Sequence, residues 1–358
     1  ARTFGMDGLF KVAGIYSHEG QKYRPVDADS LLSYREARDG QILQEGICAV
    51  GAMASFMAAG SAYAVHGLPL IPFYIFYSMF GMQRVGDMVW GCADMMCKGF
   101  LLGGTAGRTT LNGEGLQHQD GHSHVLASTV PSLLSYDPAF GYELAIIVRE
   151  GLRRMYVEQE DIFYYLTLYN ENYLMPDMAD VLARGALTQD QLMQGVLDGG
   201  YCFDPAQSEA DIHLLASGSI LQQAIRAKAE LQALGYEVSL WSMTSYVELQ
   251  RDAFAVAAAN RQNPQAPAQV SKVEAMFDDA SGAIIAVTDY MASLAQGIAA
   301  WMPAGYEVLG TDGFGLSESR AALRAHFEVD ADAIVSAALA NLYGQGLIDE
   351  EKLNAANR

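Results

Sequence analysis

Positively charged residues are scarce in this chain. Its 358 residues include 22 Lys and Arg against 42 Asp and Glu, which gives a formal net charge of −20 at pH 7. An acidic surface repels the phosphates of nucleic acids and the headgroups of anionic membranes. The composition therefore argues against nucleic acid or a membrane as a partner, and it favours a metabolic protein of the cytoplasm.

Cysteine is also rare, and the four cysteines are Cys48, Cys92, Cys97 and Cys202. Their spacing matches neither a zinc-binding motif nor a CxxC redox pair. We therefore expect reduced and mostly buried thiols, as is usual for cytoplasmic proteins.

Long apolar runs are missing as well. No apolar core of a signal peptide follows the first residues. Residues 46–83 contain no Asp, Glu, Lys or Arg, but small residues fill the first half of this segment and Pro69 and Pro72 interrupt the second. A membrane helix needs about 20 predominantly apolar residues in succession. We therefore predict a buried helix followed by a buried strand in this segment rather than a membrane span.

Apolar runs that alternate with helical segments make up most of the sequence. The first half predicts helices over 41–66, 84–98 and 139–149, and strands over 70–77, 99–103, 129–136 and 162–168, the first of them buried on both faces. A polar connector over 170–210 precedes predicted strands over 212–216, 236–242, 283–288 and 306–310 and a helix over 220–234. This alternation is typical of parallel sheets. The sequence therefore predicts an α/β fold of two domains, residues 1–200 and 201–358, with mainly parallel sheets.

Residues 103–124, GGTAGRTTLNGEGLQHQDGHSH, combine six glycines with Arg108, Glu114 and three histidines. The segment is too rich in glycine for a helix and too polar for a core strand. Loops of this length inside compact domains are usually functional or disordered, and the apolar flanks argue against disorder. We therefore predict an ordered loop that brings titratable groups to a ligand.

The residues of this loop leave three interpretations open. His118, His122 and His124 have a spacing that could bind a metal ion. Alternatively, Glu114 and His118 could carry out acid–base chemistry. The third possibility is a solvated loop in which the histidines cap turns. The segment lacks the GxGxxG spacing of a dinucleotide site, and the sequence has no Walker loop.

Two aromatic residues, Tyr77 and Phe80, lie at the carboxyl end of the predicted strand over 70–77. Ligands of α/β sheets bind beyond the carboxyl ends of the strands. An aromatic ring at that position can stack on a planar ligand ring.

Several motifs together resemble one family. They are the glycine-rich loop, IPFYIFYSMFGMQRVGDMVW, ILQEG and GTDGFGLSESR. They resemble the homodimeric, acetyl-transferring pyruvate dehydrogenases of bacteria, which belong to the thiamine-diphosphate-dependent transketolase superfamily. The resemblance extends over about residues 3–340. It implies a transketolase-like pyrimidine-binding domain over 1–200 and a transketolase C-terminal-like domain over 201–358.

The resemblance also implies a role for individual residues. Phe80 corresponds to the aromatic residue that stacks on the aminopyrimidine of thiamine diphosphate, and Ile47 to the aliphatic residue that supports its bent conformation. Tyr77 corresponds to a residue that lines the cavity near the substrate. Glu114 and His118 correspond to the polar pair that faces the substrate. No residue of this chain is implied as a metal ligand.

Ala49 departs from the family pattern. The family has a glutamate at this position, which hydrogen-bonds the pyrimidine ring and activates the cofactor. A methyl group cannot accept that hydrogen bond. Glu45 lies four residues earlier and could share a helix face with Ala49.

A second departure is that the chain contains no GDG motif. In the family, that motif belongs to the domain that binds the diphosphate of the cofactor through Mg²⁺. The resemblance therefore implies a partner subunit that carries this domain, in a dimer or heterotetramer, unless the sequence is a fragment of a longer protein, which its start without Met also suggests.

The implied function is one subunit of a split thiamine-diphosphate-dependent 2-oxo acid dehydrogenase or decarboxylase. Its substrate would be a 2-oxo acid such as pyruvate, and the acceptor of the acyl unit would be a lipoyl group on an acyltransferase. One alternative is a carboligase that transfers the unit to a carbonyl compound. The other is a non-catalytic regulatory or scaffold subunit, which Ala49 would explain.

Overall fold

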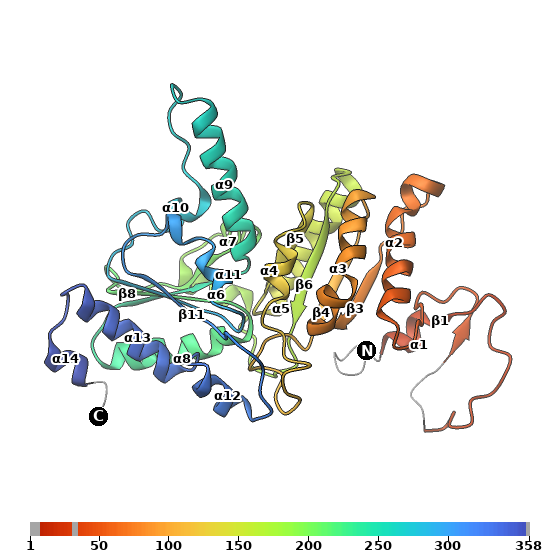
Figure 1. The fold of residues 1–358 in the computed structure, drawn as a ribbon, viewed down its shortest axis with the longest axis horizontal. Coiled ribbons are helices and arrows are strands. Elements are labelled where there is room, and N and C mark those ends of the chain that lie inside the picture. The colour runs from red at the N-terminus through yellow and green to blue at the C-terminus, as the bar shows by residue number, and fades with distance from the viewer. Residues whose placement is uncertain (1–7, 31–34, 356–358) are drawn as a thin grey trace.

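The computed structural model describes residues 8–30 and 35–355, and two sheets organise this part of the chain (Figure 1). The first sheet has the strand order β3-β4-β6-β5, and all its pairs are parallel. The second has the order β11-β10-β8-β9-β7, in which only β7 pairs in the antiparallel direction. The predicted α/β fold with mainly parallel sheets is therefore confirmed.

The strands are β1 (Ile15–Tyr16), β2 (Glu36–Ala37), β3 (Phe73–Tyr77), β4 (Phe100–Gly104), β5 (Leu133–Tyr136), β6 (Phe163–Leu168), β7 (Tyr201–Asp204), β8 (Ile212–Ala216), β9 (Val238–Ser242), β10 (Ala283–Val287) and β11 (Tyr306–Leu309). The α-helices are α1 (Leu9–Ala13), α2 (Ala49–His66), α3 (Ser78–Asp94), α4 (Ser123–Ala127), α5 (Gly141–Leu152), α6 (Met178–Gly185), α7 (Gln189–Asp198), α8 (Leu221–Ala233), α9 (Tyr246–Gln262), α10 (Lys272–Met276), α11 (Ser293–Gln296), α12 (Arg320–His326), α13 (Ala331–Gly344) and α14 (Glu350–Ala355). A π-helical turn, η2 (Arg153–Val157), continues α5, and two 3-10 turns are η3 (Gly218–Ile220) and η4 (Ala299–Trp301).

Helix α2 begins eight residues later than the sequence predicts, at Ala49 instead of Gln41. Gly46 has a φ of 64°, a left-handed conformation that a right-handed helix cannot include. The thiol of Cys48 then accepts a hydrogen bond from the backbone N–H of Gly51 at 3.3 Å and caps the helix. Residues 41–48 are therefore not helical.

The predicted burial of the first strand on both faces is wrong. Strand β3 lies at the edge of its sheet, and β4 is its sheet neighbour in the described structure. Phe73 is 48% exposed and Tyr77 is 40% exposed. An apolar run without charges fits a central strand equally well, so only the strand order reveals the edge.

The predicted connector over 170–210 contains two helices, α6 and α7, and strand β7. The hydroxyl of Thr188 accepts a hydrogen bond from the backbone N–H of Gln191 at 3.2 Å, which starts α7. Gly199, with a φ of 115°, ends it. The helices are only eight and ten residues long and bury few side chains, such as Val181 and Leu192, so each gives a short signal in the sequence.

Glu143 lies on helix α5, in the half of the chain that contains the first sheet, and it connects that half to the second sheet. Its carboxylate is fully buried and accepts hydrogen bonds from the backbone N–H groups of Ala139 and Phe140 at 2.6 and 3.1 Å. The hydroxyls of Tyr201 and Ser242, on β7 and β9, each donate to the other oxygen at 2.7 Å. Burial raises the pKa of Glu143, while these hydrogen bonds oppose the shift. The carboxylate thus satisfies donors from both sheets at once.

The substitution Glu143→Gln is expected to lower the free energy of unfolding by about 1–3 kcal/mol. The NH₂ group of the glutamine would face a hydrogen-bond donor, and an NH₂ group cannot accept a hydrogen bond. Urea denaturation measures the change. The matched control is Glu150→Gln on the same helix, whose partner is the half-exposed Arg153, and its cost should stay below about 1 kcal/mol. Equal losses in the two variants would show that Glu143 does not join the sheets.

Candidate functional site

The glycine-rich loop runs from the carboxyl end of β4 to the start of α4, and hydrogen bonds hold it at several points. The side chain of Gln119 donates to the carbonyl of Leu111 at 2.6 Å and accepts from the backbone N–H of Leu316 at 2.7 Å. The backbone N–H of Gly113 donates to the carbonyl of Glu318 at 3.0 Å. The segment that follows β11, which includes the GTDGFG motif, therefore packs against the loop.

Asp289, directly after β10, fixes the start of the loop. Its carboxylate is fully buried and accepts hydrogen bonds from the backbone N–H groups of Thr109 and Thr110 at 2.8 and 3.1 Å and from their hydroxyls at 2.7 and 2.5 Å. Burial raises the pKa of Asp289, while Arg324 and the threonines oppose the shift. Gly107 is required beside it, because a Cβ there would lie 2.2 Å from the carboxylate, at a φ of 86°.

The sequence analysis missed Asp289. A carboxylate directly after a predicted strand, at the edge of a sheet where ligands and loops gather, was the available signal. The sequence could not show that Thr109 is a hydrogen-bond partner of Asp289, because 180 residues separate the two.

Four of the predicted site residues lie together beyond the carboxyl end of β3. The rings of Phe80 and Tyr77 lie 5.0 and 5.8 Å from the imidazole of His118, both edge to face, and 6.1 Å from each other. The Nδ1 atom of His118 lies 3.2 Å from a carboxylate oxygen of Glu114, without the alignment of a hydrogen bond. We call Tyr77, Phe80, Glu114 and His118 the aromatic–acid cluster.

The aromatic–acid cluster faces solvent. The side chain of Glu114 is 47% exposed and that of His118 is 23% exposed. The guanidinium carbon of Arg84 lies 4.1 Å from the centre of the Phe80 ring, a cation–π contact. The cluster therefore presents an aromatic surface, a cation, an imidazole and a carboxylate next to one another on an open side of the protein.

The other two histidines of the loop point elsewhere. The ring of His122 contacts Gln83 and lies 3.8 Å from Asp120. His124 is buried, where its ring hydrogen-bonds the hydroxyls of Ser135 and Thr167 at 2.6 and 3.0 Å. Over residues 8–30 and 35–355, no group of three or more His, Cys, Asp or Glu is arranged to hold a metal ion. The three histidines thus do not form one cluster.

The structure does not bring Ile47 into the aromatic–acid cluster, because its side chain is fully exposed ahead of α2. Ala49 is the first residue of α2, and its carbonyl accepts a hydrogen bond of 3.4 Å from the hydroxyl of Tyr74 on β3. The carboxylate of Glu45 accepts a hydrogen bond from the hydroxyl of Ser55. Glu45 precedes the helix, so it does not share a helix face with Ala49.

Two family models match this chain. The pyruvate dehydrogenase E1 component middle domain matches residues 1–176. The transketolase-like C-terminal domain matches residues 199–330. The chain thus combines a pyruvate dehydrogenase E1 middle domain with a transketolase-like C-terminal domain.

Curated relatives are similar to this chain over nearly its whole length. The pyruvate dehydrogenase E1 component of Pseudomonas aeruginosa is 51% identical over 353 residues, and that of Escherichia coli is 48% identical over 356 residues. Each comparison covers 98% of this chain and 39% of the relative. The chain therefore spans about two fifths of the length of these relatives.

Solved transketolases share the fold. The enzyme from Leishmania mexicana has a TM-score of 0.65 at 16% identity, over 96% of this chain and 46% of that chain. A structure described as a split gene transketolase, an inactive beta4 tetramer, has a TM-score of 0.59 at 14% identity, over 95% of this chain and 97% of that chain. Within the described part of this chain, no helix is long and apolar enough to cross a membrane.

The substitution Asp289→Asn is expected to loosen the glycine-rich loop, because an amide NH₂ would face the N–H of Thr109 or Thr110, at a cost of about 1–3 kcal/mol. Hydrogen exchange of peptides that cover residues 105–118 should become faster. Asp312→Asn is the matched control, since Asp312 follows the neighbouring strand β11 but is exposed. Unchanged exchange in D289N would contradict the anchoring role.

Proposed function

We propose that this chain supplies the aminopyrimidine half of a thiamine-diphosphate site in an enzyme that decarboxylates a 2-oxo acid of the pyruvate type. The observation that carries the proposal is the aromatic–acid cluster, which places Phe80, Tyr77, His118 and Glu114 at one carboxyl end of a parallel sheet. We assign residues 1–200 to the pyrimidine-binding domain and 201–358 to the C-terminal domain.

The side chains of the aromatic–acid cluster fit one end of the cofactor and not the other. A planar heterocycle can stack on the ring of Phe80, which is bounded by Arg84 and by the edge of His118. Binding of a diphosphate through Mg²⁺ needs several oxygen ligands, and no such acidic group is found among the described residues. We therefore assign the diphosphate and Mg²⁺ to residues outside this sequence.

A large apolar surface beside the cluster supports an association with those residues. Val50, Leu70, Ile71 and Phe73, on α2, the following turn and β3, are each between 48% and 56% exposed, and Ile47 is fully exposed. Contiguous exposed apolar surface marks an interaction site. All five lie in the segment without charged residues, so this face of α2 and β3 suits contact with another domain, from the same polypeptide or from a partner subunit in a dimer or heterotetramer.

Bound thiamine diphosphate would supply the electron sink for decarboxylation. The residues of this chain would position the cofactor and the substrate and would transfer protons to or from the substrate. Phe80 would orient the pyrimidine, and Tyr77 would line the cavity over the substrate. Glu114, 3.2 Å from Nδ1 of His118, would hold the imidazole so that Nε2 carries or accepts a proton at the substrate oxygen.

The acceptor of the acyl unit separates two versions of the proposal. Transfer to a lipoyl group on an acyltransferase corresponds to a dehydrogenase component. Transfer to an aldehyde corresponds to a carboligase. Product analysis with pyruvate, in the presence and absence of an aldehyde, distinguishes them.

Ala49 favours a second candidate function, a subunit that binds partners without turnover. The alanine offers no side-chain acceptor, and the nearest acid in the sequence, Glu45, is occupied by Ser55. An enzyme that loses a positioned acid–base group typically slows by about 10²–10⁴-fold.

The substitution Phe80→Ala is expected to weaken thiamine-diphosphate binding about tenfold, because stacking contributes about 0.5–1.5 kcal/mol beyond the buried area. The assembly to test is this chain reconstituted with the remaining part of the Pseudomonas aeruginosa relative, and calorimetry gives the affinity. Phe254→Ala, at an exposed ring on α9, is the control. Tight binding of the cofactor to this chain alone, or no release of CO₂ from pyruvate by the assembly, would overturn the proposal.

The substitution Ala49→Glu is expected to raise the rate of CO₂ release by about 10²–10⁴-fold, since it adds a carboxylate at the start of α2. Ala49→Gln is the control, because an amide has the same size without the charge. Activity that appears only in A49E would identify the native chain as a binding or scaffold subunit. A native rate equal to that of A49E would mean that another group already activates the cofactor.

A further inference from the structure

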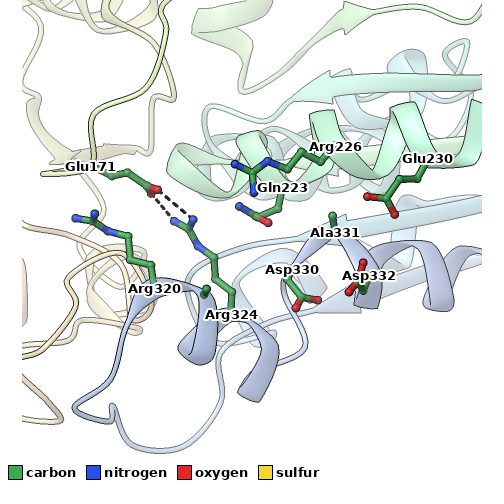
Figure 2. A pocket seen from close by; sticks show the side chains of 10 residues that line it. Glu171, Gln223, Arg226, Glu230, Arg320, Arg324, Asp330, Ala331 and Asp332 are labelled. Carbon is green, nitrogen blue, oxygen red and sulfur yellow. Dashed lines mark hydrogen bonds and ion pairs between the residues drawn. The ribbon is translucent and has the colours of Figure 1, made fainter.

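A polar cavity of about 440 Å³ lies between Glu171 and helices α8, α12 and α13 (Figure 2). Its volume falls within the range of about 300–1,000 Å³ that is usual for small-molecule sites. None of its lining residues belongs to the aromatic–acid cluster. Three arginines line it, in a chain that has 22 basic residues and a net charge of −20.

One end of the cavity carries the arginines. Arg324 is 5% exposed and binds both carboxylate oxygens of Glu171, but its Nε has no hydrogen-bond partner. Arg320 uses its Nε to donate to the carbonyl of Thr110 at 2.6 Å, and its terminal nitrogens donate to no described residue. Arg226 makes no hydrogen bond or ion pair with any residue in 8–30 or 35–355, and it extends toward Glu171 in Figure 2.

The amide of Gln223 lies beside these arginines. The residue as a whole is 5% exposed and lines the cavity, and its side chain has no hydrogen-bond partner in the described structure. The amide atoms are not buried, so they are open to the cavity. The arginine end thus offers free donors from three side chains, Arg226, Arg320 and Gln223.

The opposite end of the cavity carries carboxylates. Asp330 is engaged, because its side chain accepts a hydrogen bond from the backbone N–H of Ala333 at 3.0 Å and caps α13. The side chains of Glu230 and Asp332 make no hydrogen bond or ion pair within the described ranges, and they lie on the side away from Glu171 in Figure 2. Since Arg324 neutralises Glu171, the charges without an ion-pair partner in the described structure are Arg226 and Arg320 at one end and Glu230, Asp330 and Asp332 at the other.

Opposite charges that line one cavity without pairing point to a ligand that complements both ends. We propose that the cavity binds a small dipolar molecule with an oxyanion at Arg226 and Arg320 and an ammonium group or hydroxyls at Glu230 and Asp332. Guanidinium groups bind carboxylate and phosphate through paired N–H donors, which suits this end of the cavity to either oxyanion.

The ligand would also contact the anchor of the glycine-rich loop. Arg320 holds the carbonyl of Thr110, and the side chain of Thr110 binds Asp289. Occupancy of the cavity therefore restrains the loop that carries Glu114 and His118. The importance of this restraint for catalysis rests on the proposed function, but the restraint itself is measurable without thiamine diphosphate or turnover.

Calorimetry on the full chain tests the binding with four probes: O-phosphoethanolamine, β-alanine, inorganic phosphate and ethanolamine. We expect a dissociation constant below about 1 mM for at least one of the two dipolar probes, weaker binding of inorganic phosphate and none of ethanolamine. Preference for O-phosphoethanolamine identifies a phosphate ligand, and preference for β-alanine identifies a carboxylate ligand. If neither dipolar probe binds with this affinity, the proposal is wrong.

Three variants at exposed positions locate the site without disturbing the fold. Arg226→Gln should weaken binding of the preferred dipolar probe about tenfold or more, whereas Arg261→Gln, on α9, should leave it unchanged. Glu230→Gln should weaken binding of the dipolar probe, because it removes the attraction for the ammonium group. It should strengthen binding of inorganic phosphate, because it removes a repulsion of the anion. Equal effects of R226Q and R261Q would place any binding elsewhere and overturn the assignment.

Hydrogen exchange tests the link to the loop. Saturating probe should slow exchange in peptides that cover residues 105–118, and this effect should be absent in R226Q. Binding that leaves this exchange unchanged would contradict the restraint. Since no cofactor or substrate is used, a failure here leaves the proposed function unaffected, and an inactive assembly leaves this binding result unaffected.

Discussion

The arrangement of the candidate site depends on the buried carboxylate of Asp289. It gathers two backbone N–H groups and two hydroxyls of Thr109 and Thr110 at the carboxyl end of β10. A buried carboxylate is stable only where donors surround it, so the loop and the second sheet hold each other in place. Glu143 plays the corresponding role between α5 and strands β7 and β9. These two acids tie the two sheets together, and the loop that carries Glu114 and His118 lies where they meet.

The edge position of β3 explains why the aromatic–acid cluster is open. A strand at an edge leaves one side of its aromatic residues without a neighbour, and α2 covers only part of that side (Figure 1). The segment without charged residues is therefore half exposed in this chain. Its composition suits burial, which another domain of an E1 assembly would complete.

The same loop connects this open side to the arginine-lined cavity. Arg320 and Arg324, on α12, reach Thr110 and Glu171, which follow β4 and β6. Three of the 22 basic residues of this acidic chain thus line the cavity, and one of them, Arg320, contacts the loop at Thr110. The two sites share one anchor, the contact between Thr110 and Asp289.

The sequence alone determined the elements that depend on neighbours in the chain. Apolar runs gave the positions of β4, β6, β8, β9 and β10 within a few residues, because a buried strand is recognisable from its own side chains. The motifs of the loop and of residues 70–90 also brought Tyr77, Phe80, Glu114 and His118 into one predicted site, where the structure places them together.

Only the tertiary structure decided the features that join distant segments. The left-handed Gly46 delays α2 until Ala49, strand order puts β3 at an edge, and Ile47 lies outside the aromatic–acid cluster. Asp289 finds Thr109 across 180 residues, and Arg226, Arg320 and Glu171 meet around a cavity. Local periodicity records which residues are apolar, but a hydrogen bond between residues far apart in the chain depends on how the sheets and helices pack against one another.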